Sequence, residues 1–228
     1  MAADEHTSIG HHPVAHPPSG LSGRLALAVV LAALVVSGLA PTERGTWLLE
    51  VVWVLIALPI VLLTWRRFPL TALLTWLLVL HAVVLCYGGH YTYAETPLGD
   101  WARDTFDLAR NHYDRLGHFV QGFVPAIAVR ELLLRLTPLR PGGWLFTLVT
   151  AVCLAISACF EFVEWGAAVV LGSGADAFLA TQGDEWDTQW DMFVCLIGAV
   201  LSLLVLSRWH NRQLGDRIHR TDPVLVGL

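Results

Sequence analysis

The chain has 228 residues, of which 55% are hydrophobic and only 14% are charged, and its formal net charge is −5. Soluble domains usually contain about a quarter charged residues, so this composition argues against a soluble enzyme. The negative net charge and the lack of Lys give no general attraction to phosphate backbones, which argues against a nucleic-acid partner. The apolar residues instead form long blocks, and these predict an all-α polytopic membrane protein.

Six blocks approach or reach the length of about 17–25 residues that a helix needs to cross a bilayer. They predict a bundle of about six transmembrane helices in contact with membrane lipids, at about Leu25–Ala40, Thr46–Trp65, Pro69–Tyr87, Tyr113–Leu136, Trp144–Leu171 and Trp190–Trp209. The first block has a second interpretation. Arg24, a 16-residue apolar run and the small residues near Ala40 are also typical of a secretory signal peptide, whose cleavage would leave five spans.

The distribution of Arg predicts the orientation. Ten of the 14 basic residues, all of them Arg, fall on one side of the predicted spans, and loops rich in positive charge stay in the cytoplasm. We therefore expect a multi-pass protein of the bacterial inner (plasma) membrane with both termini in the cytoplasm. Residues 1–22, rich in His, Pro and Gly, predict a disordered cytoplasmic tail, residues 23–209 a six-span domain, and residues 210–228 a second cytoplasmic tail. The first large outer loop holds a predicted amphipathic segment around Trp101–Arg110.

Ionisable side chains inside a span cost about 2.5–3.5 kcal/mol each at the helix centre, yet three predicted helices carry them in pairs. Each pair has i, i+3 or i, i+4 spacing, which places both members on one helix face, and all lie toward the extracytoplasmic side. The pairs are Asp114 with His118, Glu161 with Glu164, and Asp187 with Asp191. We expect these six side chains to converge on one polar cavity that opens to the outside.

So many carboxylates cannot all be ionised at close range unless cations neutralise them. Arg115 supplies one positive charge. A divalent metal such as zinc or manganese could neutralise the remaining carboxylates, because carboxylates with an imidazole suit these ions. The expected metal ligands come from the six paired residues, and the expected catalytic residues are Asp114, His118, Glu161, Glu164 and Asp191. The alternative is that some of the carboxylates stay protonated.

Three further acidic or imidazole residues lie in the spans. Glu50 and His81 are at a similar depth to the pairs, in the second and third spans. Glu131 lies on the inner side beside Arg130, which predicts an interfacial ion pair between these two neighbours. The four Cys residues lie inside spans without CxxC spacing, which predicts small buried apolar side chains.

Three sequence runs carry a family resemblance. The runs Tyr113–Phe123, Phe160–Trp165 and Gln182–Met192 resemble the YjdF-like family of bacterial inner-membrane proteins, over about residues 46–212. The resemblance implies a multi-span inner-membrane protein and no specific activity. A shorter motif, Asp114-Arg115-Leu116-Gly117-His118, is similar to the Asp-Lys-x-x-His motif of VanZ-like membrane proteins, with Arg in place of Lys. That partial resemblance implies envelope chemistry by analogy only.

Three classes of function fit these residues. A metal-dependent, hydrolase-type enzyme would activate water against a lipid-linked or envelope substrate, with one carboxylate left as general base. A structural or interaction protein would use the same polar cluster only to fix helix packing. A cation or proton transporter would use it as a binding site, although no inverted repeat is visible in the sequence.

Overall fold

The computed structural model describes residues 18–215, with the backbone alone described at positions 173, 174, 176 and 177. The described chain is helical and contains no strand. Six long helices are present: α1 (Gly20–Gly38), α2 (Arg44–Thr64), α3 (Ala72–Tyr91), α5 (Tyr113–Leu136), α6 (Gly143–Leu171) and α8 (Asp187–Leu214). The short elements are η1 (Tyr93–Glu95), α4 (Pro97–Phe106), η2 (Gly172–Ala175) and α7 (Asp176–Leu179).

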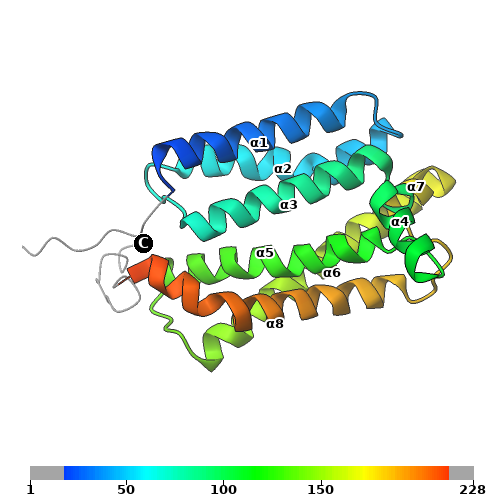
Figure 1. Ribbon diagram of the computed structural model, residues 1–228. Helices are drawn as coiled ribbons and strands as arrows, with labels where there is room; N and C mark the ends of the chain where they lie inside the picture. Colours follow the sequence, from blue (N-terminus) through cyan, green and yellow to red (C-terminus); the bar gives the residue numbers. More distant parts are fainter. Residues whose placement is uncertain (1–17, 216–228) are drawn as a thin grey trace, which may run out of the picture.

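The long helices form two groups of three that lie side by side (Figure 1). The helices α1 and α2 both pack on α3, whereas α5, α6 and α8 pack on one another, and α3 joins the groups through α5. The helices α4 and α7 lie together at one end of the bundle, called here the loop end. The start of α1 and the end of α8 lie at the opposite end, called here the terminal end.

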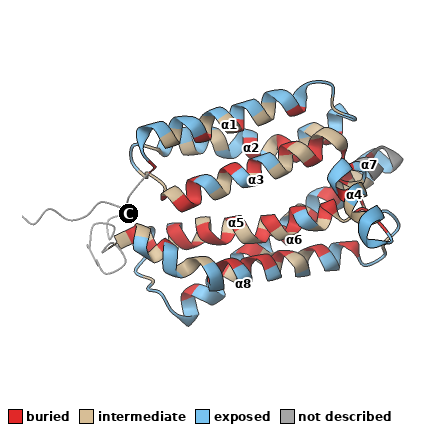
Figure 2. Ribbon diagram, viewed as in Figure 1, coloured by how far each residue is buried: buried red, intermediate tan, exposed pale blue. Residues whose placement is uncertain are grey.

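The lengths and compositions of the helices confirm a polytopic helical membrane protein. Five helices are long and apolar enough to cross a bilayer, namely α1, α2, α3, α6 and α8. The helix α5 has 24 residues but carries five charged ones. It packs against α3, α6 and α8, so its polar groups have protein rather than lipid around them. Figure 2 shows buried positions gathered on α3 and α5, while α1 is mostly exposed.

Two glycines allow α5 and α8 to approach closely. A Cβ atom on Gly122 of α5 would overlap the carbonyl of Cys195, and one on Gly198 of α8 would overlap the carbonyl of Phe119. Small residues at a helix crossing permit this backbone contact, which is a common source of affinity between helices in membranes. The crossing fixes the register between α5 and α8, and so the distance between the polar residues that precede it on each helix.

A buried polar network ties α3, α5 and α8 together at the terminal end, and it corrects the expected partner of Glu131. The Glu131 carboxylate is wholly buried and accepts hydrogen bonds from Arg135 at 2.6 Å and from the Thr71 hydroxyl at 2.7 Å, and it lies 3.0 Å from the His210 ring. Arg130 instead contacts His210. The prediction of an interfacial Arg130–Glu131 pair was wrong, because successive residues of a helix point in different directions.

The helix ends differ somewhat from the boundaries expected from the sequence. The helix α1 begins at Gly20, where Ser19 caps it by accepting a hydrogen bond from the Ser22 amide, and α8 continues to Leu214 because the network around His210 holds its last turns. Most of the expected tails, residues 1–17 and 216–228, lie outside the described residues. In the first outer loop, α4 is helical close to the expected segment. Three Cys residues are buried, but Cys159 is exposed.

Candidate functional site

The six residues singled out from the sequence all lie at the loop end and are all buried. Asp114 and His118 project from the first turns of α5, Asp187 and Asp191 from the first turns of α8, and the other two from the second half of α6. Their exposed fractions are 5%, 4%, 6%, 8%, 6% and 1% for Asp114, His118, Glu161, Glu164, Asp187 and Asp191. The side chains therefore face the interior of the bundle rather than its surface.

Three of these residues form the tightest group, called here the central triad: Asp114, His118 and Asp191. Each offers one ligand atom, and the three atoms lie within 4.8 Å of one another. The His118 Nε2 atom lies 3.8 Å from the Asp114 carboxylate and 3.8 Å from Glu161 Oε1. The geometry follows from the helix crossing, because His118 lies one turn before Gly122 and Asp191 two turns before Gly198.

Glu164, the other acidic residue of α6, is linked to this group through Glu161. Glu161 lies within hydrogen-bonding reach of the Glu164 and Thr188 side chains, so the two glutamates continue the triad toward α6.

Two arginines cover the triad on its outer side. Arg110 donates a hydrogen bond to Asp187 at 2.8 Å, and Arg115 donates one to Asp184 at 2.5 Å. Arg110 also binds the carbonyl of Thr181, which ties the two outer loops together. The backbone N–H of Trp186 and the neighbouring Arg115 hold the pKa of Asp184 below its usual range. Asp187 thus lies near the triad but is already occupied by an ion pair.

Below this arginine layer several buried polar atoms lack a partner among the described residues. They include His118 Nδ1, Gln121 Oε1, Asp191 Oδ1, Glu161 Oε1 and the hydroxyl of Ser157. Arg115 Nε approaches Asp191 Oδ1 only to 3.7 Å, which is beyond a hydrogen bond. Native proteins rarely leave buried polar atoms unpaired, so this concentration of them next to the triad indicates a place for a ligand.

Sequence reasoning left two contributors out of the site. Glu50 of α2 is 3% exposed and lies against the Tyr93 hydroxyl. Burial, and then the charge of Glu50, raise the pKa of Tyr93, so this phenol stays protonated. From the sequence, Arg110 is only one of the four Arg residues on the outer side of the predicted spans. An ionisable residue in the span was a signal for Glu50, whereas nothing local distinguishes Arg110 from Arg103.

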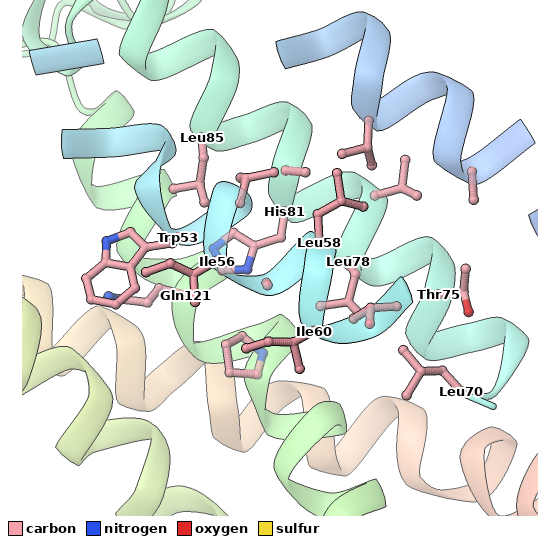
Figure 3. A pocket seen from close by; sticks show the side chains of 18 of the residues that line it. Trp53, Ile56, Leu58, Ile60, Leu70, Thr75, Leu78, His81, Leu85 and Gln121 are labelled. Carbon is pink, nitrogen blue, oxygen red and sulfur yellow. The ribbon is translucent and has the colours of Figure 1, made fainter. Parts of the chain in front are cut away.

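A large cavity of about 1000 Å³ adjoins the triad and is called here the groove. It is lined mainly by apolar side chains of α1, α2, α3, α5 and α6, but Asp114, His118 and Gln121 also line it. Figure 3 shows Trp53 and Gln121 at one end of the groove and Leu70 and Thr75 at the other. The polar site and the apolar groove are therefore continuous.

Comparison with known proteins gives two matches. Residues 23–212 match the family described as "Predicted membrane protein (DUF2238)", a longer stretch than the resemblance suggested. The chain is also 49% identical over 181 residues to the inner membrane protein YjdF of Escherichia coli (strain K12), covering 79% of this chain and 87% of that protein. No solved structure matches the chain. The resemblance to VanZ-like proteins gains no support here and stays a prediction.

Proposed function

This chain belongs to the DUF2238 family of membrane proteins, which includes YjdF, and we propose that it is an inner-membrane enzyme that uses a divalent metal ion to hydrolyse an envelope or lipid-linked substrate. The location is supported by the name of the Escherichia coli relative. The loop end is proposed to face outward and both termini the cytoplasm, because ten of the 14 Arg residues fall, by sequence, on the side of the predicted spans that carries the termini.

The metal would be held by the central triad. Two carboxylates and one imidazole are a donor set that suits zinc or manganese, and the ligand atoms of Asp114, His118 and Asp191 lie within 4.8 Å of one another. The observation that carries the proposal is the convergence of these three ligand groups, together with the buried, unpartnered Oδ1 atom of Asp191. A cation also offsets the repulsion among the buried carboxylates.

The neighbouring residues supply the other parts of a hydrolytic site. A bound divalent ion lowers the pKa of a water molecule and polarises the bond under attack. Glu161, 3.8 Å from His118 Nε2, is placed to accept a proton from that water as general base. Glu164, within hydrogen-bonding reach of Glu161, can take the proton onward. Asp187 remains with Arg110 in the outer layer, so we propose that it positions the arginines and does not bind the metal.

The two alternative functions account for fewer of these features. A purely structural cluster would be expected to pair its buried groups, as the network around Glu131 does. A transporter needs a polar route across the bilayer, whereas the groove that leaves the triad is mostly apolar.

Metal analysis of the purified protein tests the proposal. Wild-type protein, purified without chelator and incubated with zinc or manganese, is expected to retain about one ion per chain, because three ligand groups converge at one point. Asp114→Asn and Asp191→Asn are expected to lose it. Asp187→Asn, of equal chemical change, is the matched control and is expected to keep it. A wild-type protein without bound metal, or a metal lost equally in Asp187→Asn, contradicts the proposed site.

The chemistry is tested separately from binding. Glu161→Gln is expected to keep the metal and to lose hydrolysis of a chromogenic phosphate or acyl ester that carries a long alkyl chain and is presented in detergent micelles, by about 10²–10⁴-fold as for a general base. Equal hydrolysis by wild type, Glu161→Gln and the metal-free protein would refute the enzyme, even if the metal site stands.

A further inference from the structure

The groove differs from an ordinary interior cavity because it opens through the side of the bundle. Its rim consists of apolar residues that are themselves exposed, such as Ile56 and Ile60 on α2 and Val152 and Ile156 on α6. The helix α2 packs on α3. In the described part of the chain, α2 makes few contacts with α5 or α6, so the gap between them stays open. In a membrane this opening faces hydrocarbon rather than water.

Aromatic rings line the groove toward the loop end. The rings of Trp53 on α2 and Phe160 on α6 lie 6.3 Å apart, and Phe160 also lies edge-on to His118 at 5.6 Å. Next to these rings the lining becomes polar, with Glu50, Asp114 and His118. A molecule entering from the side would therefore meet the candidate metal site at one end of the groove and mostly apolar walls along the rest, where Arg24, Thr75 and His81 are among the polar exceptions.

The length of the groove also distinguishes among ligands. Its wall on α2 extends from Glu50 to Trp65, and fifteen steps of about 1.5 Å make about 22 Å. The hydrocarbon core of a whole bilayer is about 30 Å thick. A ligand that fills the groove must therefore carry an apolar chain longer than half of the bilayer core, which small water-soluble molecules and short acyl esters lack.

We infer that the groove binds the long hydrocarbon chain of a membrane lipid, which enters sideways between α2 and α6 and places its polar head at the central triad. This inference deepens the proposed function, on which it rests, because it names lipids as the substrate class. Free carboxylates of the triad would repel an acidic lipid head, whereas a bound divalent ion would attract it.

Photochemical labelling in a bilayer tests the inference. The full-length protein is reconstituted in vesicles of phosphatidylethanolamine and phosphatidylglycerol that contain a phospholipid with a diazirine in its acyl chain, and adducts are mapped by mass spectrometry. We expect adducts on Leu58 and Leu78, which line the groove. Leu204 of α8, 69% exposed, reports ordinary lipid contact, and Val149, wholly buried, reports background.

Two variants separate binding in the groove from general lipid contact. Ala57→Trp and Ala155→Trp put an indole into the groove from opposite walls, at positions that are exposed and therefore tolerant. Both are expected to reduce the labelling of Leu58 and Leu78 to the level of Val149 and to leave that of Leu204 unchanged. Ala32→Trp, on an exposed part of α1 away from the groove, is the matched control and should label as wild type does.

The outcomes distinguish this inference from the metal site. Wild-type labelling of the groove no higher than that of Val149 overturns the inference, as does labelling that Ala57→Trp and Ala155→Trp both leave intact. An unlabelled groove in a protein that cross-links to itself would mean that a second copy fills it, which also overturns the inference. Metal content is measured in the same samples. A wild-type protein that binds no metal but is labelled in the groove would refute the proposed enzyme and leave the inference of a lipid-binding groove supported.

Discussion

Asp114→Asn is expected to make the metal-free protein more stable and to abolish its stabilisation by metal. The ligand atoms of Asp114 and Asp191 lie within 4.8 Å of each other, and two ionised carboxylates at that distance repel by about 3 kcal/mol at an effective dielectric constant of about 20. A proton held by the cluster reduces the repulsion. The expected gain in free energy of unfolding without metal is therefore about 1–3 kcal/mol.

Thermal unfolding in detergent, followed by the fluorescence of the ten Trp residues, measures both effects. In chelator, Asp114→Asn should unfold at a higher temperature than wild type. With zinc or manganese at 100 times the dissociation constant, wild type should gain about 2.7 kcal/mol and Asp114→Asn nothing. Asp104→Asn, on exposed α4, is the control and should match wild type in both buffers. A metal-free Asp114→Asn protein less stable than wild type would refute the reasoning, because Asp114 would then be a structural residue.

Three further predictions concern the α5–α8 crossing, the Glu131 network and the pH dependence of the loop end. Gly198→Leu should overlap the Phe119 carbonyl, lower stability by about 1–3 kcal/mol and abolish metal retention. Gly166→Leu is the control, because an added Cβ there meets no atom within 4 Å, and it should change neither stability nor metal retention. Glu131→Gln should cost about 3 kcal/mol of unfolding free energy by breaking a buried pair and leave metal content unchanged; loss of metal there would contradict the separation of the two networks. Metal retention should fall between about pH 7 and pH 5 as protons compete for the ligands. The pKa of Asp184 is lowered, so its carboxylate stays ionised between pH 7 and pH 5. Its ion pair with Arg115 should therefore persist over that range and be lost only below about pH 4, the usual pKa of an Asp side chain. Protease cleavage of the outer loop should report the loss of the Asp184–Arg115 pair. Cleavage that rises at the same pH as metal release would contradict the prediction that the metal is lost first.

The sequence predicted well those features that depend on local spacing. A bilayer requires about 20 apolar residues in a helix, so the long apolar runs marked the spans without knowledge of their neighbours. The i, i+4 spacing of Asp114 and His118 likewise placed both on one face of α5, and the polar character of that helix indicated a position inside the bundle. The structure agrees because α5 is surrounded by α3, α6 and α8.

Contacts between residues far apart in the chain were not predictable in this way. One partner of Glu131 is His210, 79 positions away, and Arg110 reaches Asp187 across 77 positions. The Gly122–Gly198 crossing and the groove also depend on how whole helices pack, which no single helix encodes. For the same reason Asp187 appeared equivalent to Asp191 in the sequence. In the structure the two differ because Asp187 forms an ion pair with Arg110 from the outer loop.

Anomalous diffraction from crystals grown with zinc or manganese tests the central claim most directly. The account predicts one peak among Asp114, His118 and Asp191, about 2.0–2.2 Å from an imidazole nitrogen and from carboxylate oxygens, which disappears in Asp191→Asn crystals. Two results would contradict it. One is peaks found only on exposed acidic loops, and the other is crystals soaked to saturation with metal in which Arg115 contacts the triad carboxylates and no peak is present there.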